Sequence, residues 1–238
     1  MKEVFALIEK EKEEFTHLPF FKFLQDENIE LKQRLAWVPC FAPLAMSFGD
    51  LWKYVFRKEP AGSIVQEIIN NHTYEDENHN KWFPEDIEEL GFENSLNFSD
   101  SLNFLWGQET EKTRWVCQQI AIDTFSADPI IVLVAIEAIE AIANITFFHT
   151  MQITQQLQKA TGRNYRYFGD EHFNADDGHT TSLDVEKLIG DIQLTPEQQV
   201  KAFEIIEKVF AVFRECYDEL MIYAKKHSNK QPQLLPAA

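Results

Sequence analysis

The segment from 130 to 143 constrains the fold more than any other, because it is apolar on nearly every side of a helix. From residue 132 it reads VLVAIEAIEAIA. A helix that is apolar all round is buried at the centre of a domain, so we expect a central helix over 130–160. Glu137 and Glu140 interrupt the run, which favours a core helix over a membrane span. Burying an unpaired carboxylate is costly, so one of these glutamates needs a cation, and a metal ion would supply it.

Composition favours helices over a β-sandwich. The chain has 238 residues, of which eight are Gly and nine are Pro, leaving little room for many tight turns. Hydrophobic residues make up 45%, with 20 Phe and five Trp, enough to build a sizeable core. No strand pattern and no repeat is visible. We therefore expect an all-α fold, with a single helical domain over 1–230 and a flexible tail over 231–238.

Charge and cysteine content exclude several classes of partner. The net charge of -17 argues against binding nucleic acid, whose phosphates need clustered Lys and Arg. The three cysteines Cys40, Cys117 and Cys216 are odd in number and widely spaced, so neither a disulfide framework nor a thiolate zinc site is expected. The amino-terminal residues 2–15 predict a charged amphipathic helix and lack the apolar core of a signal peptide. We expect a cytoplasmic protein with no membrane partner.

The segment 167–179 is the first candidate site. If it is helical, His172, Asp176 and His179 stand at positions i, i+4 and i+7 and share one face. Imidazole and carboxylate together suit iron, manganese or zinc. The plainer alternative is a solvated helix end that carries two histidines by chance.

A second candidate site lies in the helix that we expect over 64–90. Along it His72, Glu75, Asp76 and His79 form one stripe. The plainer alternative is an exposed acidic helix. Further helices are expected over 102–126, from 196 to about 226, and over 29–55 with breaks near Pro39 and Pro43, since proline inside a helix removes a hydrogen bond.

Three separate helices therefore each offer carboxylate or imidazole, and helical bundles build dimetal sites in this way. The pattern of His-x3-Asp-x2-His, with a Glu in an apolar helix and a Glu/His pair earlier, resembles the haem-oxygenase-like dimetal oxidases. The turn LPFF over 18–21 is similar to that family's opening turn. The resemblance covers nearly the whole chain and implies a haem-oxygenase-like bundle of about seven helices.

The resemblance also implies a ligand set and a cofactor, namely two iron ions per chain with dioxygen as co-substrate. Glu140 is preferred to Glu137 because its distance to His172 fits the family's spacing, and Glu137 becomes a supporting carboxylate. His72 stands where the family often has Glu, so Glu75 is a reserve ligand. The implied metal ligands are His72, His79, Glu140, His172, Asp176 and His179, of which Glu140, His172, Asp176 and His179 are also expected to be catalytic.

Within the family, segments 71–79 and 165–170 most resemble the indole-nitrile synthases, which act on halogenated tryptophan with two irons and O2. The function expected is O2-dependent conversion of a halogenated or plain tryptophan-type amino acid to an indole-3-carbonitrile. One alternative is oxidative cleavage or desaturation of another amino acid or a fatty acid. Another is a non-enzymatic helical binding module with a vestigial metal site. The sequence does not decide between iron and manganese, or whether the protein forms a homodimer.

Overall fold

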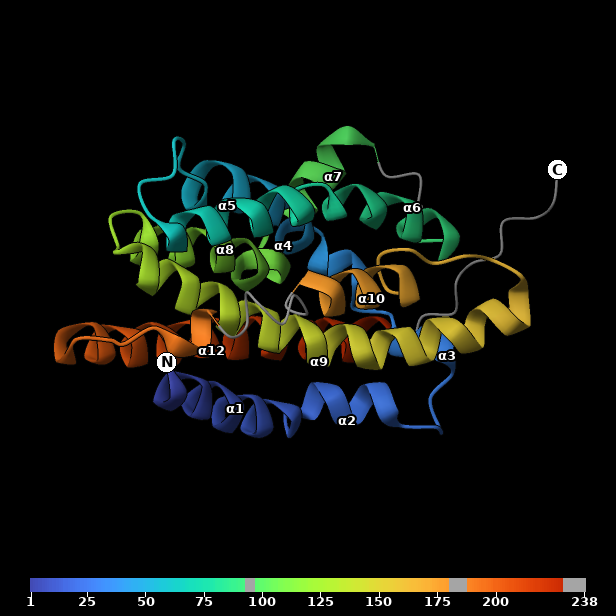
Figure 1. Cartoon of the computed structure of the whole chain (residues 1–238). Coiled ribbons are helices and arrows are strands. Elements are labelled where there is room, and N and C mark those ends of the chain that lie inside the picture. Colours follow the sequence, from blue (N-terminus) through green and yellow to red (C-terminus); the bar gives the residue numbers. More distant parts are fainter. Residues whose placement is uncertain (93–96, 180–187, 229–238) are drawn as a thin grey trace, which may run out of the picture.

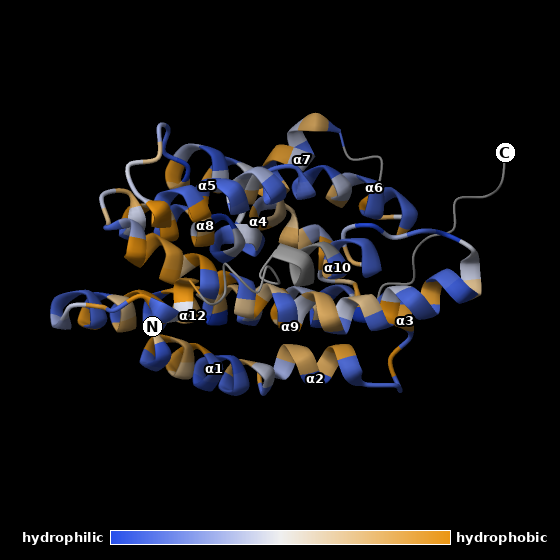
Figure 2. Cartoon of the chain, in the orientation of Figure 1, coloured by the Kyte–Doolittle hydropathy of each residue, from blue (hydrophilic) through white to orange (hydrophobic). Residues whose placement is uncertain are grey.

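The two longest helices, α9 (Pro129–Thr161) and α12 (Pro196–His227), pack against each other through the middle of the molecule (Figure 1). Figure 2 shows α9 turning from hydrophobic in its amino-terminal half to hydrophilic at its carboxyl end. This helix is long and apolar enough to cross a membrane, yet 67% of its most apolar stretch is buried inside the protein. It is a core helix, as predicted.

Local signals set the ends of both helices. The Asp128 side chain accepts the N–H of Ile130 at 2.9 Å, and Pro129 occupies the first turn, where its missing N–H costs little. Gly162 ends α9 with a φ of 73°, a left-handed conformation that glycine adopts without strain. A capping box of Thr195 and Gln198 begins α12. The predicted helix over 130–160 is therefore confirmed to within one residue at each end.

The computed structural model describes residues 1–92, 97–179 and 188–228, with side chains described except in 175–179. In this part of the chain there are eleven α-helices and no strand, which confirms the all-α prediction. Figure 1 places α1 and α2 along one side of the central pair and α4 to α8 on the other. The remaining elements are α1 (Lys2–Thr16), α2 (Pro19–Gln25), α3 (Leu31–Arg34), α4 (Val38–Asp50), the π-helix η1 (Leu51–Phe56), α5 (Ile64–Asp76), the 3-10 helix η2 (His79–Lys81), α6 (Trp82–Glu89), α7 (Phe98–Leu105), η3 (Gln108–Thr110), α8 (Glu111–Thr124) and α10 (Asp170–His179).

Two of the expected helices are each divided into shorter ones. The described part of the chain therefore has more helices than the expected number of about seven. The helix expected over 64–90 ends at Asp76 and restarts as η2 and α6. Pro84 explains this, because within a continuous helix its ring would clash with the carbonyl of Asn80, whereas in the first turn of α6 it is tolerated. The helix expected over 102–126 is divided at Gly107, whose backbone is extended.

Prolines near the start of α4 act differently from one another. Pro39 lies in the first turn, as a helix start allows. Pro43 lies inside α4 without ending it, so the break expected there is wrong. Phe41 and Leu44, on either side of it, are buried in the core, and their packing offsets the lost hydrogen bond.

The aromatic side chains of the LPFF turn pack into the centre of the core. Pro19 begins α2, and Phe20 and Phe21 are both buried. Their ring centroids lie 5.0 Å and 5.6 Å from that of Tyr217 on α12. The Tyr217 hydroxyl is hydrogen-bonded to Thr146 on α9. This cluster ties α2 to both central helices.

A carboxylate from α12 caps the first turn of α8. Glu219 accepts the backbone N–H groups of Lys112 and Thr113 at 2.9 to 3.0 Å. We expect Glu219→Gln to lower the free energy of unfolding by about 1–2 kcal/mol, because a charged cap of two helix N–H groups is lost. Urea unfolding measures the change.

The matched control is Glu215→Gln, one turn earlier on α12. Glu215 is an exposed residue that pairs with the Nζ of Lys112 at 2.6 Å and reaches α8 through that side chain. Its replacement should change stability by no more than about 0.5 kcal/mol. Equal losses in the two variants would show that Glu219 contributes as an ordinary surface charge.

Candidate metal centre

A cavity opens between α4, α5, α9, α10 and α12. Its inner space that can hold water-sized groups is about 60 Å³, below the range of drug-sized small-molecule sites. One part of its wall is polar and another is aromatic and aliphatic. The polar part includes Asp76, His79, Glu140 and His172, and the apolar part includes Phe41, Phe48, Trp52, Ile139, Phe147 and Phe213.

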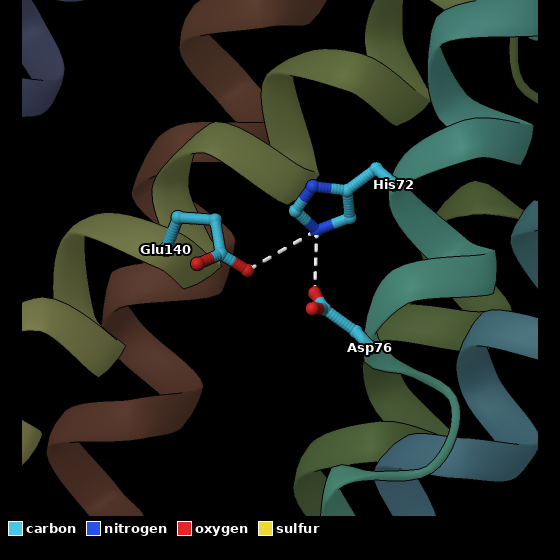
Figure 3. A group of neighbouring side chains, drawn as sticks. All are labelled: His72, Asp76 and Glu140. Carbon is cyan, nitrogen blue, oxygen red and sulfur yellow. Dashed lines mark ion pairs between the residues drawn. The ribbon is translucent and has the colours of Figure 1, made fainter. Parts of the chain in front are cut away.

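Three side chains from two helices meet beside this cavity (Figure 3). His72 and Asp76 lie one turn apart on α5, and Glu140 faces them from α9. The Nε2 of His72 lies 2.9 Å from Oδ2 of Asp76 and 3.3 Å from Oε1 of Glu140. One nitrogen or oxygen donor from each residue lies within 4.8 Å of the others, so a single metal ion could contact all three. We call this group the His72 triad.

Electrostatics in the triad favour a cation. Burial acts to lower the pKa of His72, but hydrogen bonds and charge attraction from Asp76 and Glu140 raise the pKa well above its usual value. The two carboxylates therefore hold either a protonated imidazole or a metal ion. Metal binding would displace the proton, because an imidazole ligand must be neutral.

His79 and His172 extend the cluster along the cavity wall. His79 comes from η2, and its Nδ1 lies 3.6 Å from Oδ1 of Asp76. The centroids of the His79 and His172 rings are 4.7 Å apart. Asp76 thus links the triad to His79, whose ring lies next to that of His172.

The protonation of His172 follows from its backbone contact. Its Nδ1 lies 2.8 Å from the carbonyl oxygen of Tyr167. A carbonyl oxygen only accepts hydrogen bonds, so Nδ1 carries the proton. In the neutral ring the lone pair is then on Nε2, the arrangement that metal-binding histidines usually have.

The implied ligands have different outcomes. The structure brings His79, Glu140 and His172 to one cavity, and His72 lies beside it, against Glu140. The backbone of α10 places positions 172, 176 and 179 on one helix, as expected. The side chains of Asp176 and His179 lie outside the described residues, so their part in the site stays a prediction.

Asp76 is a member of the cluster that the implied ligand set left out. Glu75, the reserve ligand, lies on the exposed side of α5, whereas Asp76 is buried. Helix geometry offers a signal, because position i+4 lies nearer to His72 around the axis than position i+3. Glu140 lines the cavity and belongs to the triad, consistent with its choice over Glu137.

Flat aromatic side chains form another part of the wall. The Phe48 ring is stacked with Trp52 at 5.8 Å between centroids and 25° between planes. On α12, Phe213 stacks with Phe48 at 6.5 Å and 19°. Trp52 also contacts the ring of His72 edge-on at 5.4 Å. These rings give the cavity a near-parallel apolar wall beside the triad.

Comparisons with known proteins do not assign the chain to a family. A scan against protein-family models gives no match, and a search of curated proteins gives none. Function is therefore argued from the geometry and chemistry of the site.

Proposed function

We propose that the chain is a non-haem dimetal oxidase with a haem-oxygenase-like fold that converts a tryptophan-type amino acid to an indole-3-carbonitrile. The observation that carries this proposal is the His72 triad, with Asp76 buried and His72 and Glu140 half-buried, beside an aromatic-lined cavity. Its donors are one imidazole and two carboxylates, a set that suits iron. Residues from α5 and α9 supply these donors, as in other dimetal helical bundles.

The residues present fit such ions. His72, Asp76 and Glu140 would hold iron on one side of the cavity, and His79 and His172 adjoin them. Asp176 and His179 on α10 would complete the set. Bound iron would supply the binding and reduction of O2.

The chain's own side chains would bind and orient the substrate. The polar α-amino and carboxyl groups of an amino acid would lie at the polar end of the cavity, beside Asp76 and Glu140. The indole would lie against Phe48 and Phe213. Bromine on the ring would bury further apolar surface at about 25 cal/mol per Å², which favours halogenated over plain tryptophan.

The test is anaerobic loading with Fe(II), addition of α-15N-labelled bromotryptophan, and exposure to O2. We expect a nitrile that retains the label, because oxidation would act at the amino nitrogen and the neighbouring carbons. Plain tryptophan should react more slowly. A nitrile without label, or none, would contradict this reaction. Other amino acids and fatty acids should be tested in the same assay. Turnover of one of these instead would favour oxidative cleavage or desaturation by the same fold.

A second candidate, a metal-free helical binding module, is supported by one observation. With His72 protonated, the triad is an ion-pair network in which a cation already lies between two carboxylates. Anaerobic titration with Fe(II) separates the two candidates. The oxidase should take up close to two ions per chain, and the module none.

A further inference from the structure

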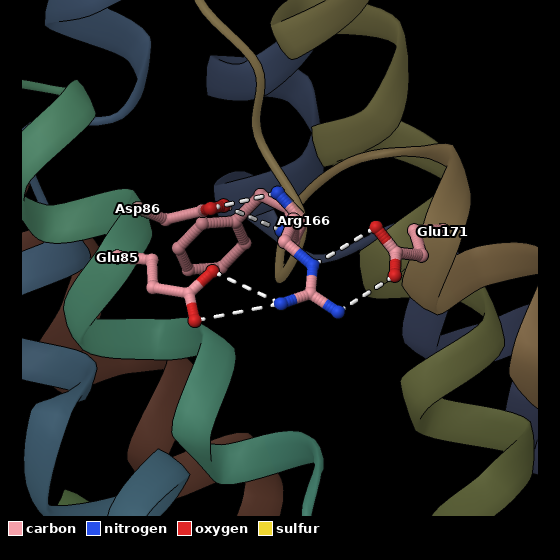
Figure 4. A network of polar contacts seen from close by, with 5 residues as sticks. Glu85, Asp86, Arg166 and Glu171 are labelled. Atoms are coloured by element: carbon pink, nitrogen blue, oxygen red, sulfur yellow. Dashed lines mark hydrogen bonds and ion pairs between the residues drawn. The ribbon is translucent and has the colours of Figure 1, made fainter.

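The turn over 165–169, which leads into α10, is held against α6 by the carboxylate of Asp86 (Figure 4). Its Oδ1 accepts the N–H of Arg166 at 2.7 Å, and its Oδ2 accepts the N–H of Phe168 at 2.9 Å. Asp86 is only 1% exposed, so these bonds are shielded from water. The turn is tight, because a Cβ on Gly169 would lie 1.9 Å from the carbonyl oxygen of Tyr165.

Tyr167 lies between the two residues whose amides Asp86 binds. Its carbonyl oxygen is the one that accepts the Nδ1–H of His172. With the amides on both sides anchored, the direction of this carbonyl is set by Asp86. The carboxylate on α6 thus acts on His172 without touching it.

The 165–169 turn also contacts His79 indirectly, through the ring of Trp82. Arg166 pairs with Glu85 on α6 at 3.2 Å and with Glu171 on α10 at 2.7 Å (Figure 4). Its guanidinium lies 4.8 Å from the centroid of the Trp82 ring, a cation–π distance. Trp82 in turn stacks on His79 at 4.5 Å and 21°. Both cavity histidines therefore depend on how this turn sits on α6.

A carboxylate suits this position better than an amide. Asn at position 86 would offer one oxygen to two N–H donors and would turn an NH2 donor toward one of them. Burial raises the pKa of Asp86 to about 6, while its hydrogen bonds from the backbone N–H groups of Phe168 and Arg166 oppose that shift and the charge of Glu85 adds to it. At neutral pH the group is therefore mainly ionised despite its burial. A buried charge of this kind is costly unless the fold or the site uses it.

We propose that Asp86 is a positioning residue that, through the 165–169 turn, fixes His172 with its proton on Nδ1 and its Nε2 available to a metal ion. The claim that Nε2 of His172 binds a metal ion rests on the proposed function. The claim that Asp86 fixes the ring tautomer does not. Groups that hydrogen-bond to a metal-binding histidine fix the orientation of its ring. Asp86 would do this indirectly, through the backbone groups of residues 166 to 168.

The first measurement is the 15N spectrum of ring-labelled histidines in metal-free protein, with His172 assigned from a His172→Gln variant. Wild-type His172 should show a protonated Nδ1. Asp86→Asn should shift the ring nitrogens toward a mixture of the two tautomers. Glu85→Gln is the matched control, because Glu85 neighbours Asp86 and binds the guanidinium of Arg166 rather than the backbone amides. It should leave the spectrum of His172 unchanged.

The second measurement is anaerobic binding of Fe(II). Asp86→Asn should weaken binding by about 10- to 100-fold, as loss of a group that orients a ligand does. Glu85→Gln should weaken it by much less. A wild-type tautomer for His172 in Asp86→Asn overturns the inference, whatever the iron affinity.

Failure of the proposed function is distinguishable from failure of this inference. If no form of the protein binds iron, the proposed function fails, while a tautomer shift in Asp86→Asn still supports the role of Asp86. If Asp86→Asn does not fold, hydrogen exchange in the wild type decides. The amides of Arg166 and Phe168 should then exchange as slowly as those of the buried half of α9, and rapid exchange would overturn the inference.

Discussion

Replacing Glu140 with glutamine is expected to remove at least one of two bound iron ions and to reduce turnover by at least about 100-fold, beyond the loss typical of supporting groups. Glu140 is the carboxylate that α9 contributes to the His72 triad, with Oε1 3.3 Å from Nε2 of His72. A neutral amide is a weaker ligand and leaves the ion's charge less balanced. Iron content after anaerobic loading and O2-dependent product formation measure the two losses.

Glu137→Gln is the matched control, one turn earlier on the same apolar helix. It should keep both ions, because Glu140 rather than Glu137 belongs to the triad. Full iron content in Glu140→Gln would rule out the assignment of this ligand. Equal losses in both variants would point to a general effect of charge on α9.

The same iron measurement extends to α5, where neighbouring carboxylates form a second matched pair. Asp76→Asn should lose iron, since Asp76 contacts both His72 and His79. Glu75→Gln should keep it, since Glu75 lies on the exposed side of the helix. His72→Ala should keep one ion and lose O2 activation. Normal turnover in His72→Ala would transfer the ligand role to another residue.

The elements best predicted from sequence are those whose signals are local. The central helix α9 follows from its apolar run together with Pro129 and Gly162 at its ends. The division of the segment 64–90 does not follow from the residue pattern, because the histidine and acid stripe continues past Asp76 although the helix does not. Pro84 carried the signal, but the position of the break depends on packing that the sequence does not display.

The sequence predicts the types of residue in the candidate site better than it predicts which of these side chains contact one another. Spacing and resemblance predict His72 and Glu140 as ligands, and the structure places them side by side, whereas the choice of Asp76 over Glu75 depends on which side of α5 faces α9. Asp86 gave no sequence signal at all. Its role depends on two backbone amides about eighty residues away, and backbone amides are the same in every non-proline residue.

Phe168→Ala is expected to have the largest effect on stability, a loss of about 3–5 kcal/mol in the free energy of unfolding. Phe168 is fully buried, and its ring lies 5.4 Å from Trp37 and 5.9 Å from Phe83. Its carbonyl also accepts the Thr154 hydroxyl of α9 at 2.8 Å, so the cavity left by alanine would lie where the turn joins two helices.

Urea unfolding of Phe168→Ala should be compared with Phe168→Leu and with Phe148→Ala. Leucine fills most of the volume, so its loss should be smaller, about 1–2 kcal/mol. Phe148 lies on α9 with 42% of its surface exposed, and its removal should cost less than about 1 kcal/mol. Because Asp86 anchors the amide of Phe168 while the core anchors its ring, Phe168→Ala should also weaken iron binding. A loss below about 1 kcal/mol would mean that the turn is held by Asp86 and Arg166 rather than by packing.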